Sequence, residues 1–305
     1  MKKSLPLLSL LSLGLIFGGP VDSINKEALA ASHGKNVNWN LSTWGKRRAF
    51  TEGIEAVSKY VADKSGGHFT IKINYGGTLS KPRENLDGIS LGAFEAATFC
   101  ASYHADKNKA VTVLELPFLP ITNGDVQKAA DLAVYSHPAT IKEMKKWNAK
   151  LLMSAALPQY EFMGRGKEPR TIADFKGMRV RALGGIGKAM KVIGAVPTTV
   201  TAPETYRAIE TGTVDAAAFA FYSHFSYKIN EVSKWRTTNL SPGSVNCPLV
   251  VNIDAYNSLS DKNKKILTDA VDAGYAALDK AYSASIDKYT PVAEKQGIKK
   301  ITYSE

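Results

Sequence analysis

Residues 178–219, MRVRALGGIGKAMKVIGAVPTTVTAPETYRAIETGTVDAAAF, contain a complete run of strand and helix patterns. A short strand-like stretch is followed by two stretches with helical spacing, which end at Gly194 and Gly212, and then by a buried apolar stretch. These four stretches are Met178–Arg181, Ile186–Ile193, Pro203–Thr211 and Val214–Phe219. A strand, two helices and a strand in this order predict part of an α/β sheet with helices packed on it.

The same kind of pattern occurs in the rest of the chain. Period-two alternation at 37–42 and 69–75, and a short apolar run at 96–100, predict three strands with helices at 50–64 and 82–91 between them. Further strands are predicted at 149–156 and 248–253, and a long helix at 260–290. Two α/β units in one chain predict two lobes with a ligand cleft between them, at the carboxyl ends of the strands.

Composition and charge argue against disorder and against a nucleic-acid partner. Of the 305 residues, 44% are hydrophobic, and the formal net charge is +11. The basic residues occur in short runs such as Lys46–Arg48 and Lys142–Lys146, which are typical of a solvated surface. A nucleic-acid-binding protein would carry a contiguous basic face instead. We therefore expect no nucleic-acid partner.

The N-terminus has the pattern of a cleaved signal peptide. Lys2 and Lys3 precede an apolar run from Leu5 to Phe17, and Ala28-Leu29-Ala30 supplies the small residues of a cleavage site. The apolar run is shorter than the roughly 20 residues that a membrane-spanning helix needs. We therefore expect residues 1–30 to be removed and the mature protein to be exported.

Motifs of several common enzyme classes are missing from the sequence. It has no GxSxG, HExxH or CxxC motif, and its five histidines do not have metal-ligand spacing. Gly184–Lys188 follows a strand and opens a helix, but it lacks the spacing of a phosphate-binding loop. Its backbone N–H groups could still help to hold an anion. We expect no catalytic residues, no cofactor and no metal.

The two cysteines, Cys100 and Cys247, allow two interpretations. They could pair in an oxidising compartment, or they could line a pocket as free thiols. Their spacing in the sequence does not decide between these alternatives.

Several spaced motifs together resemble the substrate-binding proteins of TRAP transporters, the DctP-like family. In chain order they are Gly76–Leu79 with Arg83, Leu91–Ala93, Leu116–Leu119, Thr171–Arg181, Ile193–Pro197, Pro203–Tyr206 and Ala208–Ala216. The resemblance covers nearly the whole mature chain. It implies a two-lobed receptor with the periplasmic-binding-protein fold, which closes on a small organic acid and delivers it to membrane permease subunits.

The resemblance also implies how the chain is divided between the lobes. Lobe I is expected to contain residues 31–158 and 247–286, and lobe II residues 159–246 and 287–305. The long late helix would then span both lobes. We expect the protein to be a monomer.

Arg181 falls on the carboxylate-binding arginine of this family. A guanidinium matches a carboxylate with two parallel hydrogen bonds, although strand alternation places Arg179 on the same face. The resemblance and the order of the elements give these candidate ligand-binding residues: Arg181, Glu161, Tyr160, Trp44, Phe219, Tyr222, Cys100, Ser102, Tyr103 and Asn246.

Two departures from the family pattern indicate the kind of ligand. Glu161 stands where some relatives have a second arginine, and Phe219 where sialic-acid binders have an asparagine. Both oppose a second anionic group, so we expect a monocarboxylate with a polar or aromatic body, or a sulfonate. His104 and His224, near predicted strand ends, could also contact the ligand. A secreted enzyme and a sensor module on the same scaffold are the alternative functions.

Overall fold

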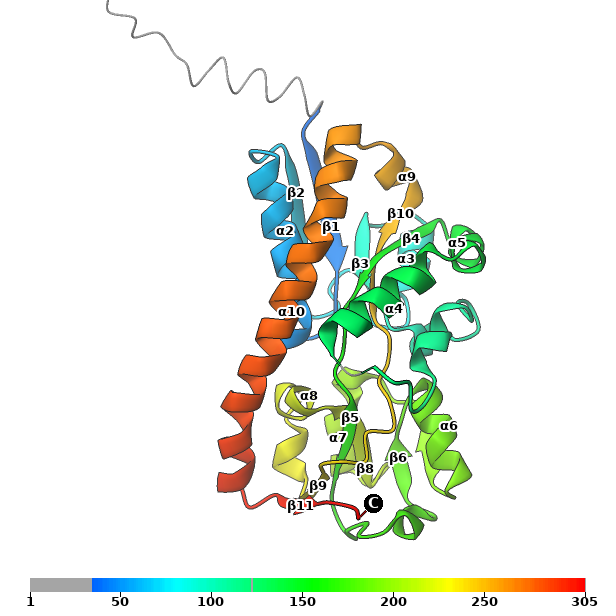
Figure 1. Ribbon diagram of the computed structural model, residues 1–305, viewed down its shortest axis with the longest axis vertical. Helices are drawn as coiled ribbons and strands as arrows, with labels where there is room; N and C mark the ends of the chain where they lie inside the picture. Colours follow the sequence, from blue (N-terminus) through cyan, green and yellow to red (C-terminus); the bar gives the residue numbers. More distant parts are fainter. Residues whose placement is uncertain (1–34, 122, 305) are drawn as a thin grey trace, which may run out of the picture.

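The structure is a computed structural model that describes residues 35–121 and 123–304. Two β-sheets, each flanked by helices, form the two lobes in the upper and lower halves of Figure 1. We call the upper unit, built on the first sheet, lobe I and the lower unit lobe II. The two-lobed α/β fold predicted from the sequence is confirmed. The predicted signal peptide, residues 1–30, lies outside the described residues.

The sheet of lobe I has the strand order β2-β1-β3-β10-β4. Its strands are β1 (Val37–Ser42), β2 (Phe69–Asn74), β3 (Ala96–Thr98), β4 (Ala149–Ser154) and β10 (Pro248–Asn252). β1 pairs in parallel with β2 and β3, whereas β10 is antiparallel to β3 and β4. Side chains alternate along β1, so Trp39 and Leu41 face one core, where Trp39 packs edge-on against Phe69.

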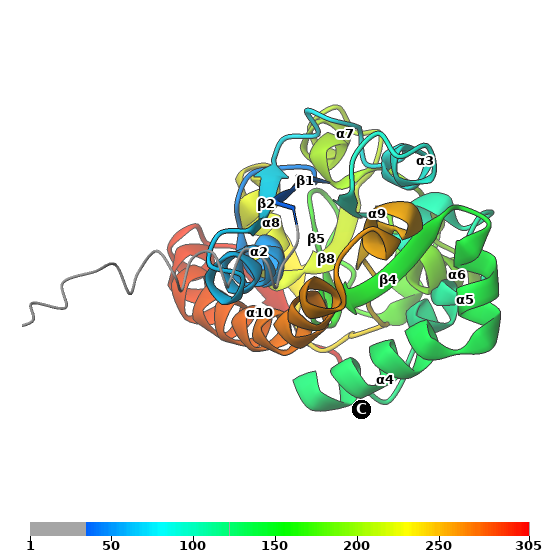
Figure 2. The same cartoon turned by 90° about the horizontal axis from the view of Figure 1, so that it is seen from above.

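Helices flank this sheet, as the view from above in Figure 2 shows. They are α2 (Glu52–Lys64), α3 (Asn85–Ser90), α4 (Gly124–Ser136), α5 (Pro138–Lys145) and α9 (Ile253–Asn257), with the 3-10 turns η1 (Ala49–Thr51), η2 (Ala101–His104) and η3 (Val111–Glu115). Ile54, Val57 and Val61 recur at helical spacing on α2 and are buried. α4 begins after Asn123, whose side chain accepts a hydrogen bond from the Val126 N–H at 3.0 Å.

The sheet of lobe II has the strand order β11-β9-β5-β8-β6-β7. Its strands are β5 (Tyr160–Gly164), β6 (Arg179–Arg181), β7 (Val196–Thr198), β8 (Ala216–Ala220), β9 (Trp235–Thr237) and β11 (Lys299–Ile301). Its helices are α6 (Gly184–Val192), α7 (Thr205–Glu210) and α8 (Phe221–Ser226), with η4 (Ile172–Phe175), η5 (Ala202–Glu204) and η6 (Ile229–Val232). The central strand β8 is fully buried, in keeping with its alanine-rich sequence.

The long helix α10 (Asp261–Lys295) runs along one side of both lobes (Figure 1). It packs on α2 in lobe I and on α8 in lobe II. Gly53 of α2 allows a close approach, because a Cβ there would lie 2.8 Å from Cγ of Leu278. Farther along, Tyr289 stacks on Phe225 of α8 with ring centroids 4.6 Å apart. None of the described helices is both long and apolar enough to cross a membrane.

The predicted elements are found with small shifts at their ends. The helix predicted at 82–91 is shorter, Asn85–Ser90, and the helix predicted at 203–211 has a 3-10 turn at its start. The long helix continues past its predicted end at residue 290 and through Pro291. The sequence analysis did not identify β5, β7, β9, β11, α4, α5, α8 or α9.

Candidate functional site

A cavity lies between the lobes, at the ends of their strands. Lobe I contributes residues that follow β1 and β3, and lobe II contributes the start of β5 and the ends of β6 and β8. The cavity volume is about 20 Å³, which is room for about one water molecule. The lobes are therefore closed on the cavity. Its lining is Trp44, Arg48, Phe50, Cys100, Tyr103, Leu157, Tyr160, Arg181, Leu183, Ala202, Phe219, Tyr222, Ser223, Tyr227 and Val245.

Arg181, the last residue of β6, is a buried cation in this cavity, with only 1% of its surface exposed. Its Nε donates to the Val200 carbonyl at 3.0 Å and its Nη1 to the Ala218 carbonyl at 2.8 Å. Its Nη2 lies 3.3 Å from the Tyr103 hydroxyl, which belongs to lobe I. The guanidinium also lies 4.0 Å from the ring centroid of Phe219. These contacts fix its orientation and leave some of its five N–H groups unused.

No acidic side chain among the described residues neutralises Arg181, because its hydrogen bonds go to neutral oxygens. A buried charge without a partner is costly, so such a cation is suited to an anionic ligand. Arg179 differs, since it lies at the start of β6, is exposed and pairs with Asp215 at 2.5 Å. The structure thus distinguishes two arginines that strand alternation alone could not.

Arg48 brings a second guanidinium to the cavity, from lobe I. It belongs to the Lys46–Arg48 run, which we interpreted above as solvated surface. Its Nη1 donates to the backbone carbonyls of Trp44 at 2.9 Å and Lys46 at 2.8 Å. The guanidinium lies over the rings of Phe50 and Tyr227, 4.5 and 5.4 Å from their centroids. Arg48 therefore packs on the aromatic lining of the site.

The aromatic wall connects the two arginines. Phe219, under Arg181, stacks on Tyr227, under Arg48, with ring centroids 5.8 Å apart. The buried hydroxyl of Tyr227 has no hydrogen-bond partner among the described residues. Burial raises the pKa of Tyr160 above its usual value, so its hydroxyl stays protonated. The site therefore combines apolar rings, neutral hydroxyls and two cations.

The structure brings most of the predicted site residues together. Arg181, Tyr160, Trp44, Phe219, Tyr222, Cys100 and Tyr103 all line the cavity. Glu161, Ser102 and Asn246 are not in its lining. Each of these three has its polar group directed to partners elsewhere.

Glu161 does not face the ligand cavity, because side chains alternate along β5 and Tyr160 takes the cavity side. The Glu161 carboxylate accepts hydrogen bonds from the Ser241 N–H at 2.9 Å and the Ser241 hydroxyl at 3.0 Å. It also accepts one from the Thr237 hydroxyl. It therefore fastens β5 to β9 and the following segment, and it does not pair with Arg181 or with Arg165.

Ser102 and Asn246 also have internal partners. The Ser102 hydroxyl donates to the buried carboxylate of Glu115. The Asn246 side chain donates to Asp131 at 2.9 Å and to Ser154 at 3.2 Å, inside lobe I. Their side chains support the region around the site without lining the cavity.

The two histidines near the strand ends are buried outside the cavity lining. His224 Nε2 lies 3.1 Å from the Glu161 carbonyl, and burial lowers its pKa to about 3. Burial also lowers the pKa of His104, whose ring faces the Pro82 carbonyl. Over the residues that the structure describes, no cluster of His, Cys, Asp and Glu could hold a metal ion.

Cys100 and Cys247 form a disulfide bond, which decides between the two interpretations left open by the sequence. Cys100 lies between β3 and η2, directly before η2, and Cys247 directly precedes β10. The bond therefore links Cys100, which lines the cavity, to residues 238–247, the segment that returns from lobe II to lobe I. Cys100 contributes to the cavity as half of a disulfide and not as a thiol.

Sequence reasoning missed part of the lining, namely Arg48, Phe50, Leu157, Leu183, Ala202, Ser223, Tyr227 and Val245. A signal existed for Arg48 and Phe50, because they lie just after the predicted first strand, on the side where strands end. Leu157 and Val245 lie in the segments that cross between the lobes, and their sequence carries no periodicity that could have identified them.

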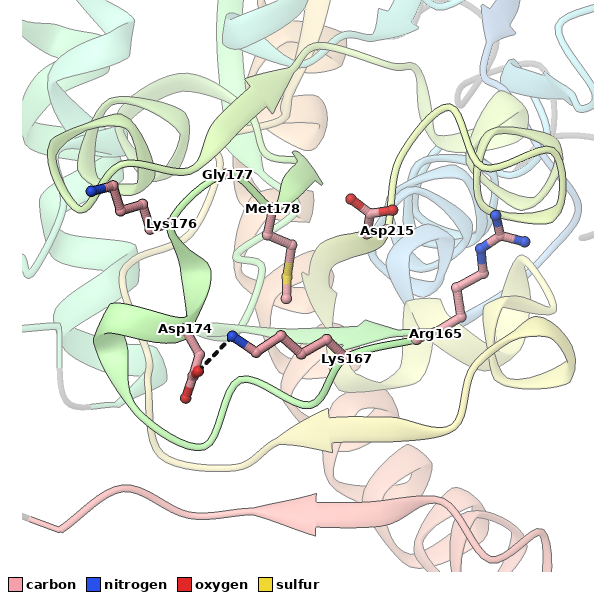
Figure 3. Close-up of a pocket in the computed structure, with 8 residues that line it drawn as sticks. Arg165, Lys167, Asp174, Lys176, Gly177, Met178 and Asp215 are labelled. Carbon is pink, nitrogen blue, oxygen red and sulfur yellow. Dashed lines mark ion pairs between the residues drawn. The ribbon is translucent and has the colours of Figure 1, made fainter.

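A larger hollow of about 600 Å³ lies on lobe II, away from this cavity (Figure 3). Its lining includes Met178 and Asp215, which directly precede β6 and β8. It therefore lies at the amino ends of these strands, whereas Arg181 lies at the carboxyl end of β6. Its acidic groups are already paired, Asp174 with Lys167 at 2.7 Å and Asp215 with Arg179. Because ligands of α/β sheets bind at the carboxyl ends of strands, we place the candidate site in the smaller cavity.

The fold and the cavity define a class, the two-lobed solute-binding proteins. Residues 42–305 match the family described as bacterial extracellular solute-binding protein, family 7, or DctP. The chain belongs to this family, as its motifs predicted. Members of the family are solute-binding proteins of TRAP transporters.

Named relatives and solved structures agree with this assignment. The chain is 25% identical to a monocarboxylate 2-oxoacid-binding periplasmic protein of Nostoc sp., covering 88% of this chain and 75% of that protein. A TRAP solute-binding protein from Roseobacter denitrificans with bound β-D-glucuronate superimposes with a TM-score of 0.76 at 21% identity, covering 88% and 89% of the two chains. A marine metagenome TRAP protein specific for aromatic acids gives a TM-score of 0.78 at 21% identity, covering 88% and 86%.

Proposed function

We propose that this protein captures a small organic acid between its lobes, with Arg181 holding the carboxylate, and delivers it to the permease of a TRAP-type transport system. The observation that carries the proposal is the buried guanidinium of Arg181, which has no acidic partner among the described residues. A carboxylate would use its free N–H groups and offset its charge. The low polarity of the surrounding wall strengthens such a pair.

The rest of the ligand would contact the wall formed by Phe219, Tyr227 and Arg48. The Tyr227 hydroxyl is buried and unpartnered, so a ligand oxygen there would satisfy it. Arg48 could take a second acceptor group. The expectation that the ligand has no second anionic group rested partly on Glu161, whose carboxylate is directed away from the cavity. We therefore propose a carboxylate whose body carries an aromatic ring or further oxygen atoms.

The relatives support a ligand of this type. The Nostoc protein is named for monocarboxylate 2-oxoacids, and the two solved structures hold glucuronate and metahydroxyphenylacetate. Each of these compounds combines one carboxylate with additional oxygen atoms. The cavity of this chain offers one deeply buried guanidinium and several hydroxyl groups to such a compound.

We also propose the setting in which the protein works. Export through a cleaved signal peptide, residues 1–30, would bring it to the periplasm, where it would act as a monomer. Lobe I would comprise residues 31–158 and 247–286, and lobe II residues 159–246 and 287–305. The protein would bind its ligand without converting it. A bound acid recovered in altered form after prolonged incubation, measured by NMR, would contradict this last point.

A thermal-shift screen of small organic acids tests the ligand class. Each acid is paired with its primary amide, which has a similar shape but no charge. Because a ligand that binds only the folded state raises the melting temperature, we expect at least one acid to raise it and its amide not to. The proposal fails if no acid raises it, or if acids and amides raise it equally.

A further inference from the structure

The Gly184–Lys188 motif, which the proposed ligand site does not use, lies against the other lobe. Glu115, at the end of η3 in lobe I, meets the start of α6 in lobe II. A Cβ on Gly184 would lie 2.3 Å from Oε2 of Glu115, and a Cβ on Gly185 would lie 1.8 Å from the Glu115 backbone carbonyl oxygen. Such distances are too short for real Cβ atoms. Glycine is therefore needed at both positions for the lobes to meet in this way.

Glu115 is held in place by groups outside α6. Only 1% of its surface is exposed. Its Oε1 accepts a hydrogen bond from the Asn246 N–H at 3.0 Å, and its Oε2 accepts one from the Ser102 hydroxyl. These donors come from the segment before β10 and from η2. The carboxyl group that faces α6 is thus already oriented by these two hydrogen bonds, and α6 covers it in the closed form.

We propose that Glu115 and the glycines at the start of α6 form a latch between the lobes, which makes closure depend on pH. The latch lies outside the ligand cavity. It would act with or without a ligand, so it does not rest on the function proposed above.

The direction of the pH dependence follows from burial. Burial in the closed form raises the pKa of Glu115 to about 7, from an ordinary value of 4.5. When the lobes part, α6 withdraws and the carboxyl group meets water, so its pKa returns toward the ordinary value. The closed form therefore binds a proton more tightly, and acid favours closure. The closed-to-open ratio should rise about tenfold from about pH 8 to about pH 6.

Few other charges surround this carboxyl group. Lys188, exposed on α6, partly opposes the rise in pKa, and Tyr160 on β5 is a neutral neighbour. Asp131 on α4 reaches Glu115 only through Asn246. Burial raises the pKa of Asp131 to about 7 as well. Its partners lie in lobe I, on α10 and in the segment before β10, so its burial does not depend on closure.

Spin labels on Lys109→Cys and Lys191→Cys, two exposed positions on the two lobes, would report closure in the full mature protein. Double electron–electron resonance at about pH 6 and about pH 8, without ligand, gives the closed and open fractions. We expect the short-distance fraction to fall as pH rises, with about a tenfold change in the ratio. In Glu115→Gln we expect the short-distance fraction to be the same at both pH values.

Two further variants make the test specific. Gly185→Ala should lose the short distance at both pH values, because its methyl group collides with the Glu115 carbonyl, while its circular dichroism stays native. In Asp131→Asn, the short-distance fraction should depend on pH as it does in the parent protein. A pH-independent distance in the parent protein, a response that survives in Glu115→Gln, or one that is abolished in Asp131→Asn would overturn the proposal.

Discussion

Replacing both Cys100 and Cys247 with serine should lower the free energy of unfolding by about 2–4 kcal/mol. The disulfide joins residues that are 147 positions apart. The chain-entropy relation for a loop of that length gives about 17 cal/mol/K, or about 5 kcal/mol at room temperature, as an upper limit. Measured values usually fall below this limit, because the unfolded chain keeps some structure.

Urea denaturation of the parent protein and of the double serine variant, each with and without a reductant, measures the difference. The reductant should destabilise the parent protein and leave the variant unchanged, which controls for effects of the reductant itself. A variant within about 1 kcal/mol of the oxidised parent would refute the reasoning. So would two thiols that react with Ellman's reagent in the native parent protein.

Three further variants test individual features. Arg48→Gln should weaken binding of an acid with a second acceptor group by roughly tenfold to a hundredfold, measured by calorimetry, whereas Arg47→Gln, a neighbour paired with Glu52 on the surface, should not. Asp131→Asn should raise stability to urea at about pH 8. Burial raises the folded-state pKa of Asp131 to about 7. The contribution of Asp131 to the free energy of unfolding is therefore most favourable in acid and is lost as the pH rises toward 7. Gly164→Ala should destabilise the protein by about 1–3 kcal/mol, because its Cβ would lie 2.6 Å from the Ala216 Cβ, and unchanged thermal unfolding would contradict this.

The long, strongly patterned elements could be predicted from the sequence. β1 matches its predicted residues, and α2 and α10 were found from apolar residues at helical spacing. The short strands β7, β9 and β11 have three residues each, too few to show an alternating pattern. Their pairing is set by tertiary contacts, such as the parallel register of Lys299 with Trp235.

The candidate site was predictable where a motif carried it and less so elsewhere. The family motif identified Arg181, and strand ends identified Trp44 and Cys100. The cavity lining does not include Glu161, and its carboxylate is bonded to Ser241. No strand was predicted at 160–164, so side-chain alternation could not be applied to this residue. Arg48 was missed because a short basic run is usually solvated, and only the packed structure places its guanidinium over Phe50 and Tyr227.

The most direct test of the central claim, that Arg181 holds the carboxylate of the ligand, is calorimetric titration of Arg181→Met with the acid selected by the thermal-shift screen. Removing one partner of a buried charge pair costs about 2–5 kcal/mol, so we expect affinity to fall by roughly thirtyfold or more. Arg179→Met, which alters the exposed arginine of the same strand, should bind the acid like the parent protein. Equal affinity of Arg181→Met and the parent protein for the acid would contradict the claim.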